Sequence, residues 1–228
     1  MTSQPMQQPI EFVSRRGRAR NRPWQSLLAA ALLGASGLAA AAPYCGELKN
    51  GYGPFDFRST PQSKLGVVED FHFTEDVQAL RRGATGQIGG DLDYLLRAVP
   101  NHPRGLLTLM RLSQKLRTPQ PPGAHFPTEC YFERAVRFQP DDGAAWALYA
   151  QYLYGEGKDK RALEMLERAA SLAPDDVAIS YNLGLAYARA KNYDAALPLA
   201  QKAYSAGFPL PGLKKMLSDA GKWTEAPQ

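Results

Sequence analysis

Apolar residues recur at helical spacing through the second half of the chain. Trp146, Tyr149 and Leu153 fall three or four positions apart, and Ala162 and Leu166 continue the pattern after a short polar break. This spacing places large side chains on one face of a helix and polar ones on the other. The pattern therefore predicts consecutive amphipathic helices in this region.

The helical pattern repeats after 34 residues. Pro140 and Pro174 each end a predicted helix, and Asp142 and Asp176 are placed to cap the next one through a side-chain oxygen. Three segments align at this offset with an alanine in register: 131–142, 165–176 and 199–210. A fixed period of this length is typical of repeat proteins.

The two best repeats carry recognisable motifs. Residues 177–210 contain Leu183-Gly184 followed by Tyr187. Residues 143–176 keep Trp146 but have Tyr149-Ala150 at the positions that correspond to Leu183-Gly184. Both units resemble the tetratricopeptide repeat, with its pattern W-x2-L-G-x2-Y, then A-x3-F, then proline. The resemblance implies an all-α protein, an α-solenoid of antiparallel helix hairpins in a superhelix. Each hairpin of such a solenoid buries its apolar stripe only against its neighbours.

Weaker copies of the hairpin extend the array in both directions. Residues 74–142 are expected to form degenerate hairpins, from helices at 74–82 and 91–100 and then at 103–117 and 127–140. Thr74 is a plausible cap for the first of them. Residues 211–228 are expected to supply a closing helix and a tail. The predicted array is four hairpins and one closing helix, with a long proline-rich loop at 118–126.

The first 41 residues have the three parts of a secretory signal peptide. A basic segment at 14–22 is followed by an apolar run at 27–41, which ends in small residues and favours cleavage before Ala42. The run is shorter than the roughly 20 residues that a membrane-spanning helix needs. Arg15-Arg16 resembles a twin-arginine signal, but the residues after it favour the general secretory route. We therefore expect a periplasmic or secreted protein with no stable membrane anchor after cleavage.

The segment 42–73 lacks helical or alternating periodicity and is expected to be an irregular strap along the solenoid. Asn50-Gly51 and Gly53-Pro54 are turn signals, and several aromatic side chains need burial. Cys45 and Cys130 are the two cysteines of the chain. An oxidising compartment favours a disulfide between them, the alternatives being a buried free Cys130 and an exposed Cys45.

The amino-acid sequence of the strap is also similar to that of known proteins. Its run Cys-Gly-x-Leu-x-Asn-Gly-Tyr-Gly-Pro-Phe-Asp-Phe, at 45–57, is followed by a degenerate repeat array. This combination resembles a set of exported bacterial tetratricopeptide repeat proteins with no assigned activity. The resemblance covers most of the chain after residue 41 and brings no functional residues with it.

Charge and motif content argue against several classes of function. Without residues 1–41 the chain has 22 basic and 21 acidic residues, a net charge of +1, and no basic stripe of the kind that neutralises phosphates. The glycines of 81–91 are not followed by a P-loop lysine. His72, His102 and His125 have no metal-ligand spacing, and no catalytic motif is present. We expect no catalytic residues, no metal, no cofactor, no nucleic acid and no enzymatic activity.

The expected function is therefore a non-catalytic scaffold that binds a protein or peptide in the bacterial cell envelope. In such superhelices the first helix of each pair lines the concave face, where arginine and aromatic side chains suit peptide recognition. An alternative is a small-ligand binder or an enzyme that uses this groove and the 118–126 loop. Helical spacing places seven residues on the concave face: Arg104, Arg111, Gln151, Tyr154, Tyr181, Asn182 and Arg189.

Overall fold

The computed structural model describes residues 45–225, and these residues form ten α-helices and no strand. The predicted signal peptide at 1–41 lies outside the described residues, as do the first three residues of the predicted strap and the end of the tail. The helices are α1 (Gln62–His72), α2 (Glu75–Gln78), α3 (Ile88–Ala98), α4 (Pro103–Leu116), α5 (Thr128–Phe138), α6 (Gly143–Gly155), α7 (Asp159–Leu172), α8 (Val177–Arg189), α9 (Tyr193–Ser205) and α10 (Gly212–Asp219).

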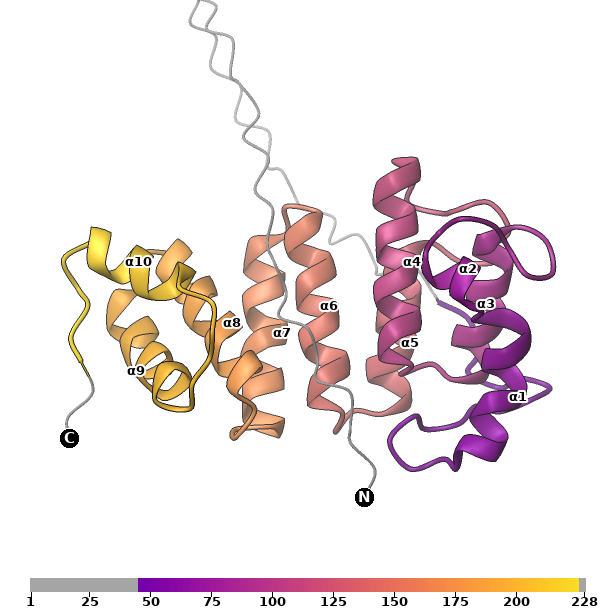
Figure 1. Ribbon diagram of the computed structural model, residues 1–228, viewed down its shortest axis with the longest axis horizontal. Helices are drawn as coiled ribbons and strands as arrows, with labels where there is room; N and C mark the ends of the chain where they lie inside the picture. The colour runs from indigo at the N-terminus through magenta and orange to yellow at the C-terminus, as the bar shows by residue number, and fades with distance from the viewer. Residues whose placement is uncertain (1–44, 226–228) are drawn as a thin grey trace, which may run out of the picture. The chain divides into compact units, whose positions relative to one another are not determined.

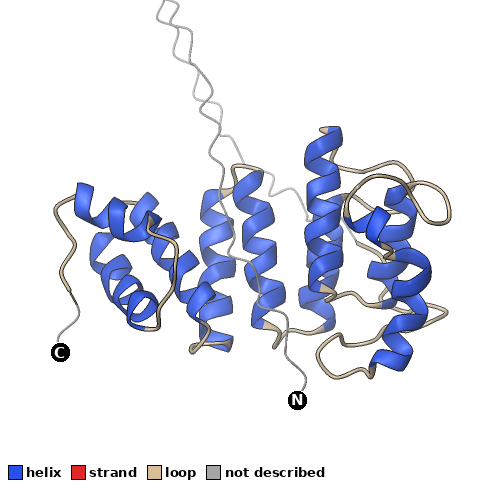
Figure 2. Cartoon of the chain, viewed as in Figure 1, coloured by secondary structure: helices blue, strands red, loops and turns tan. Residues whose placement is uncertain are grey.

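The helices pack as successive pairs, and each pair contacts the next (Figure 1). The pairs are α4 with α5, α6 with α7, and α8 with α9, while α10 closes the C-terminal end against α8 and α9. Figure 2 shows that only turns and loops connect them. The α-solenoid architecture predicted from the repeat is confirmed. Within the described part, no helix has both the length and the apolar character that crossing a membrane requires.

Small side chains allow the paired helices to approach closely, as the repeat pattern predicted. Ala162, Ala169, Ala196 and Ala203 are all fully buried. At Gly184, an added Cβ would lie 2.6 Å from the side chain of Leu213 on α10. That separation is far below van der Waals contact, so a larger residue there would push α10 away from α8.

The predicted caps are present at the starts of α6 and α8. The Asp142 carboxylate accepts a hydrogen bond from the backbone N–H of Ala145, and that of Asp176 accepts one from Ile179. Each satisfies one of the N–H groups that the first turn of a helix leaves without an intrahelical partner. The two caps fix the same start point in successive repeats.

The N-terminal pair differs from the prediction. The segment expected to be irregular contains α1, and it is α1 that packs against α3. The helix predicted at 74–82 is confined to the four residues of α2, and the Thr74 side chain makes no capping bond. The backbone turns away at Leu80, which has a φ of 55°.

The helical spacing of apolar residues in α1 is weak because the helix buries only two of its side chains, Leu65 and Val68. Val67 and Phe71 remain 51% and 65% exposed on its other side. Apolar residues on both faces remove the contrast between a buried and a solvated face that reveals an amphipathic helix in a sequence.

The irregular part of the strap, residues 45–61, is held at both ends. Cys45 is bonded to Cys130 of α5, with 5.1 Å between their Cα atoms. Arg134, on the same helix, is 1% exposed and donates hydrogen bonds to the backbone carbonyls of Cys45 and Glu47, at 3.0 and 2.7 Å. Further along, the N–H of Phe55 donates to the carbonyl of Ala98 at the end of α3.

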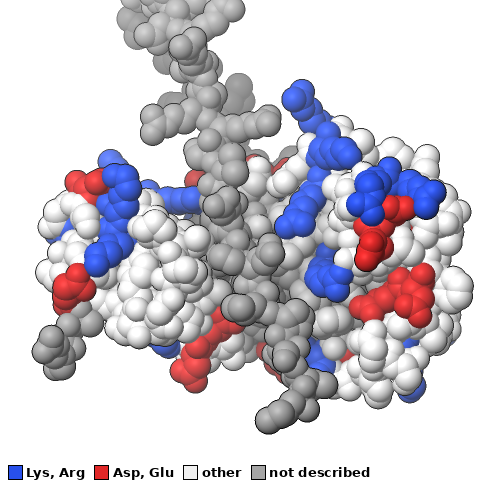
Figure 3. Space-filling view, in the orientation of Figure 1, with Lys and Arg blue, Asp and Glu red and all other residues white. Residues whose placement is uncertain are grey.

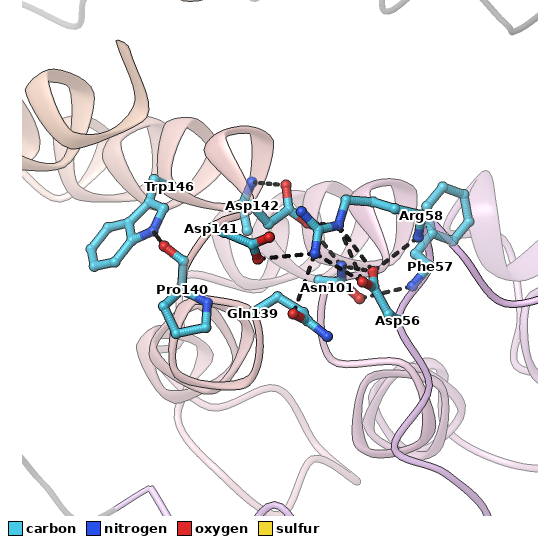
Figure 4. A network of polar contacts seen from close by, with 10 residues as sticks. Asp56, Phe57, Arg58, Asn101, Gln139, Pro140, Asp141, Asp142 and Trp146 are labelled. Atoms are coloured by element: carbon cyan, nitrogen blue, oxygen red, sulfur yellow. Dashed lines mark hydrogen bonds and ion pairs between the residues drawn. The ribbon is translucent and has the colours of Figure 1, made fainter. Parts of the chain in front are cut away.

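A buried amide links the strap to two helix junctions (Figure 4). The Nδ2 group of Asn101 donates to Asp56 at 2.7 Å and to Asp142, the α6 cap, at 2.8 Å. Its Oδ1 accepts from the N–H of Phe57 at 3.0 Å. Arg58 pairs with both Asp56 and Asp141. Asn101 thus joins the strap to the α3–α4 corner and to the start of α6.

Candidate functional site

The first helices of the pairs, α4, α6 and α8, share one register that their N-caps define. The caps are His102, Asp142 and Asp176, and each side chain accepts a hydrogen bond from the backbone N–H three residues further on. The neutral imidazole of His102 accepts through Nδ1, so its Nε2 carries the proton and donates to Glu69. Positions counted from the cap are therefore equivalent in the three helices.

One stripe of α4 and α6 is left accessible by the packing, and α8 keeps only the end of this stripe accessible. The position nine residues after the cap holds Arg111 in α4 and Gln151 in α6, exposed and half-buried, while Leu185 of α8 is buried. The position thirteen after the cap is exposed in all three helices. We call this stripe the first-helix face, and its members are Arg104, Arg111, Gln114, Lys115, Gln151, Tyr154, Gly155 and Arg189.

Contacts between neighbouring helices make the stripe continuous. An added Cβ at Gly155 of α6 would lie 3.2 Å from Nε2 of Gln114 on α4. The guanidinium carbon of Arg189 on α8 lies 5.8 Å from the ring centre of Tyr154 on α6, a cation–π contact. The C-terminal ends of α4, α6 and α8 therefore lie side by side on one surface.

Two of the seven residues predicted for the concave face are buried instead. Tyr181 is 3% exposed, its ring lies 4.3 Å from that of Phe208, and its hydroxyl faces the start of α10. Asn182 is 5% exposed and stands six residues after the cap, where α4 and α6 bury Thr108 and Leu148. Both side chains belong to the packing between helices.

The other five predicted residues, Arg104, Arg111, Gln151, Tyr154 and Arg189, lie on the first-helix face. Lys115 was not predicted, although it stands at the same distance from its cap as Arg189. Its ammonium donates to the backbone carbonyl of Leu80 at 3.0 Å and stays exposed. The signal that identifies Lys115 is the shared register, which depends on recognising His102 as a cap.

The polar groups of this face are suited to binding rather than to proton transfer. Arg104 donates to Gln78, and its guanidinium carbon lies 5.3 Å from the ring centre of Phe73. Burial raises the pKa of Tyr154 to about 12, so its hydroxyl stays protonated at neutral pH. The Oε1 of Gln151 is buried and accepts no hydrogen bond within residues 45–225.

The 118–126 loop, which the alternative function requires, packs against α3. Gly123 has a φ of 89°, and an added Cβ there would lie 2.7 Å from the backbone nitrogen of Gly90. Two hollows, of about 520 and 270 Å³, lie elsewhere. They are lined by residues of the α2 region and by the surface around Tyr204 and Trp223. Neither hollow combines the loop with the first-helix face.

Each of the three histidines pairs with one carboxylate. His72 contacts Asp91 at 3.0 Å, and His102 and His125 contact Glu69 and Asp93, both at 2.8 Å. Burial lowers the pKa of His102, which favours its neutral form. The part of the chain that the structure describes contains no cluster of three or more metal-ligating side chains.

Comparison with known proteins identifies the repeat. Residues 143–185 match the family model described as "Tetratricopeptide repeat". The chain therefore contains a tetratricopeptide repeat, and the matched region covers α6, α7 and the first part of α8. No curated protein sequence matches the chain.

Two solved structures are similar to this chain at low sequence identity. One, titled "Crystal structure of MamA protein", matches with a TM-score of 0.50 and 17% identity, over 69% of this chain and 83% of that chain. Another, "MamA RS-1 ArsTM double mutant", matches with a TM-score of 0.42 and 17% identity, over 69% of this chain and 87% of that one. The first similarity agrees with the helix-pair solenoid described above.

Proposed function

We propose that the protein is a non-catalytic scaffold that binds an extended segment of a partner protein on the first-helix face. The observation that carries this proposal is the continuity of that face. Arginine, glutamine and tyrosine side chains on α4, on α6 and at the end of α8 remain accessible, while most other side chains of these helices pack against neighbouring helices. Stacked helix pairs commonly use such surfaces for binding.

An extended chain suits the dimensions of the face. Packed helices lie about 8–10 Å apart, so crossing from α4 to α8 spans about 16–20 Å. At about 3.3 Å per residue, five or six extended residues cover this distance. The exposed guanidinium of Arg111 can donate hydrogen bonds to the backbone carbonyls of such a segment.

The proposed setting is the bacterial cell envelope, with the mature protein periplasmic or secreted and free of a membrane anchor. Two features support it. Residues 1–41 have the composition of a signal peptide for the general secretory route. The Cys45–Cys130 disulfide belongs to the class of bond that persists in oxidising compartments.

A photo-crosslinking amino acid at position 154 will capture the partner in intact cells. Because Tyr154 lies in the middle of the first-helix face, we expect a discrete crosslinked species in the envelope fraction. N-terminal sequencing of that fraction should give a mature chain that begins at Ala42. A chain that retains residues 1–41 and stays in the cytoplasm would contradict the setting, independently of the crosslink.

The matched control places the same probe at Arg168, an exposed position on the second helix α7. We expect no specific product there. A product of equal yield from both positions would contradict the proposal that the first-helix face is the binding surface.

A further inference from the structure

Helix α1, at the N-terminal end of the described array (Figure 1), leaves two neighbouring apolar side chains uncovered. Residues 45–225 expose three large apolar side chains, and two of them, Val67 and Phe71, lie one turn apart on this helix. Leu65 and Val68 are buried and α1 packs mainly against α3, so the opposite side of the helix points to solvent. Single exposed apolar residues are ordinary on protein surfaces, whereas neighbouring ones form a patch that another surface can cover.

Five exposed residues form one stripe along this side of the helix: Ser63, Lys64, Val67, Asp70 and Phe71. They stand three or four residues before and after Val67, which is the spacing of neighbours on one helix face. We call this set the α1 stripe. Its two charges are placed symmetrically, because Lys64 precedes Val67 by as many residues as Asp70 follows it.

This symmetry makes the α1 stripe complementary to itself. In an antiparallel pair of identical helices with Val67 at the centre, Lys64 of each copy faces Asp70 of the other. In the same pair, Phe71 of each copy lies over Ser63 of the other, so the largest side chain of the stripe meets a small one. A two-fold axis of this kind uses the same patch of both copies and closes after two.

The two charges are open to such a contact. Asp70 forms no ion pair and no side-chain hydrogen bond within residues 45–225. The Lys64 ammonium is exposed and pairs with no carboxylate there, and its one contact is with the Phe55 ring, whose centre is 5.9 Å away, at the outer limit of a cation–π interaction. By contrast, Asp76 already pairs with Arg82. Figure 3 shows side chains of both signs, separated by uncharged surface, over the N-terminal helices.

We propose that the α1 stripe binds a second copy of this chain, in an antiparallel helix pair about a two-fold axis at Val67. The inference does not depend on the proposed function, since the first-helix face lies on α4, α6 and α8. The stripe has no net charge, whereas an anionic membrane or a nucleic acid selects clustered cations. The nearest atom to an added Cβ at Gly66, beside the axis, is 3.8 Å away, which leaves room for the facing helix.

The size of the contact predicts a weak dimer. A helix of 11 residues is about 16 Å long, so its exposed side covers less than the roughly 800 Å² per partner that a stable complex buries. Self-association should therefore depend on protein concentration in the micromolar to near-millimolar range.

Sedimentation velocity of the purified protein over this range measures the association. We expect a monomer–dimer equilibrium that Phe71→Ser weakens at least about tenfold, because the two-fold axis removes the lost contact twice. The matched control is Leu116→Ser, which removes the third exposed apolar side chain, on α4. It should change the dissociation constant less than about twofold.

Exchange of the two charges tests the antiparallel register. Lys64→Asp and Asp70→Lys each place like charges opposite one another, so each variant alone should dimerise at least about tenfold more weakly than the wild type. An equimolar mixture of the two variants restores both attractive pairs in a mixed dimer. The mixture should therefore sediment as a dimer at concentrations where each variant alone is a monomer, and circular dichroism checks that both variants keep the helical fold.

Three results would overturn the proposal. The first is a wild-type protein that stays monomeric over the whole range, and the second is a mixture no more dimeric than its components. The third is binding to phospholipid vesicles that requires Phe71, by a protein that is monomeric in solution, because the α1 stripe would then be a membrane contact.

Discussion

Replacement of both cysteines, Cys45→Ser with Cys130→Ser, will lower the free energy of unfolding by about 4–5 kcal/mol. The disulfide closes a loop of 85 residues, and on the chain-entropy model its removal restores that much freedom to the unfolded chain. Urea denaturation followed by circular dichroism measures the change. A loss of this size is a large part of the stability of a domain, which is typically 5–15 kcal/mol.

The unmodified protein provides the control for this variant. Reduction under native conditions should reproduce the loss, and reoxidation should restore the original stability. The strap should be the first segment to exchange its amide hydrogens, because reduction removes its covalent link to α5 and leaves hydrogen bonds such as those from Arg134 to the carbonyls of Cys45 and Glu47. A reduced protein within about 1 kcal/mol of the oxidised one would show that the remaining contacts of the strap suffice.

The helix pairs from α4 onward follow from the sequence because each carries its own local signals. Alanines at close contacts, prolines after helix ends and aspartates at caps all act within one repeat. The α1–α3 pair was not predictable in this way. Few side chains of α1 are buried, and its partner lies beyond α2 and a glycine-rich loop, so the pairing depends on contacts that no local pattern records.

The contrast between local signals and contacts made by distant segments also explains which site residues were predicted. Spacing along one helix identifies the side that points away from the core, and five of the seven predicted residues lie there. Tyr181 is buried because α10 covers it, and Asn182 is buried because it stands at a position that α4 and α6 also bury. Lys115 was missed because a histidine cap is uncommon, so the register of α4 was not visible.

Replacement of Asn101 by alanine will lower the free energy of unfolding by about 3 kcal/mol. Asn101 is 3% exposed and makes three hydrogen bonds, two of them to the carboxylates of Asp56 and Asp142. Hydrogen bonds to charged groups contribute about 1.5–3 kcal/mol each, and a buried acceptor left without a donor adds a desolvation penalty. Denaturation in urea at pH 7 measures the loss.

Gln139→Ala is the matched control for this replacement. Gln139 belongs to the same network, but its side chain accepts only one hydrogen bond, from Arg58 at 3.3 Å near the surface. We expect Gln139→Ala to lower the free energy of unfolding by less than about 0.5 kcal/mol. An equal cost for the two variants would mean that Asn101 does not join the strap to the helix corners in the way described.

The pH dependence of an Asn101→Asp variant tests the electrostatic part of the same argument. Burial alone would raise the pKa of Asp56, but hydrogen bonds from Arg58 and Asn101 outweigh it and hold this pKa below its usual value. A carboxyl whose pKa is lowered by folding stabilises the protein above its ordinary pKa of about 3.9, and this contribution is lost as the pH falls through the folded pKa.

The carboxylate introduced by Asn101→Asp would stand beside Asp56 and Asp142 and would have the opposite dependence. Repulsion from the two aspartates raises its pKa, and protonation of the new carboxyl relieves that repulsion. The stability difference between the wild type and Asn101→Asp should therefore shrink as the pH falls from 7 towards about 4, and a constant difference would exclude charge repulsion as its cause.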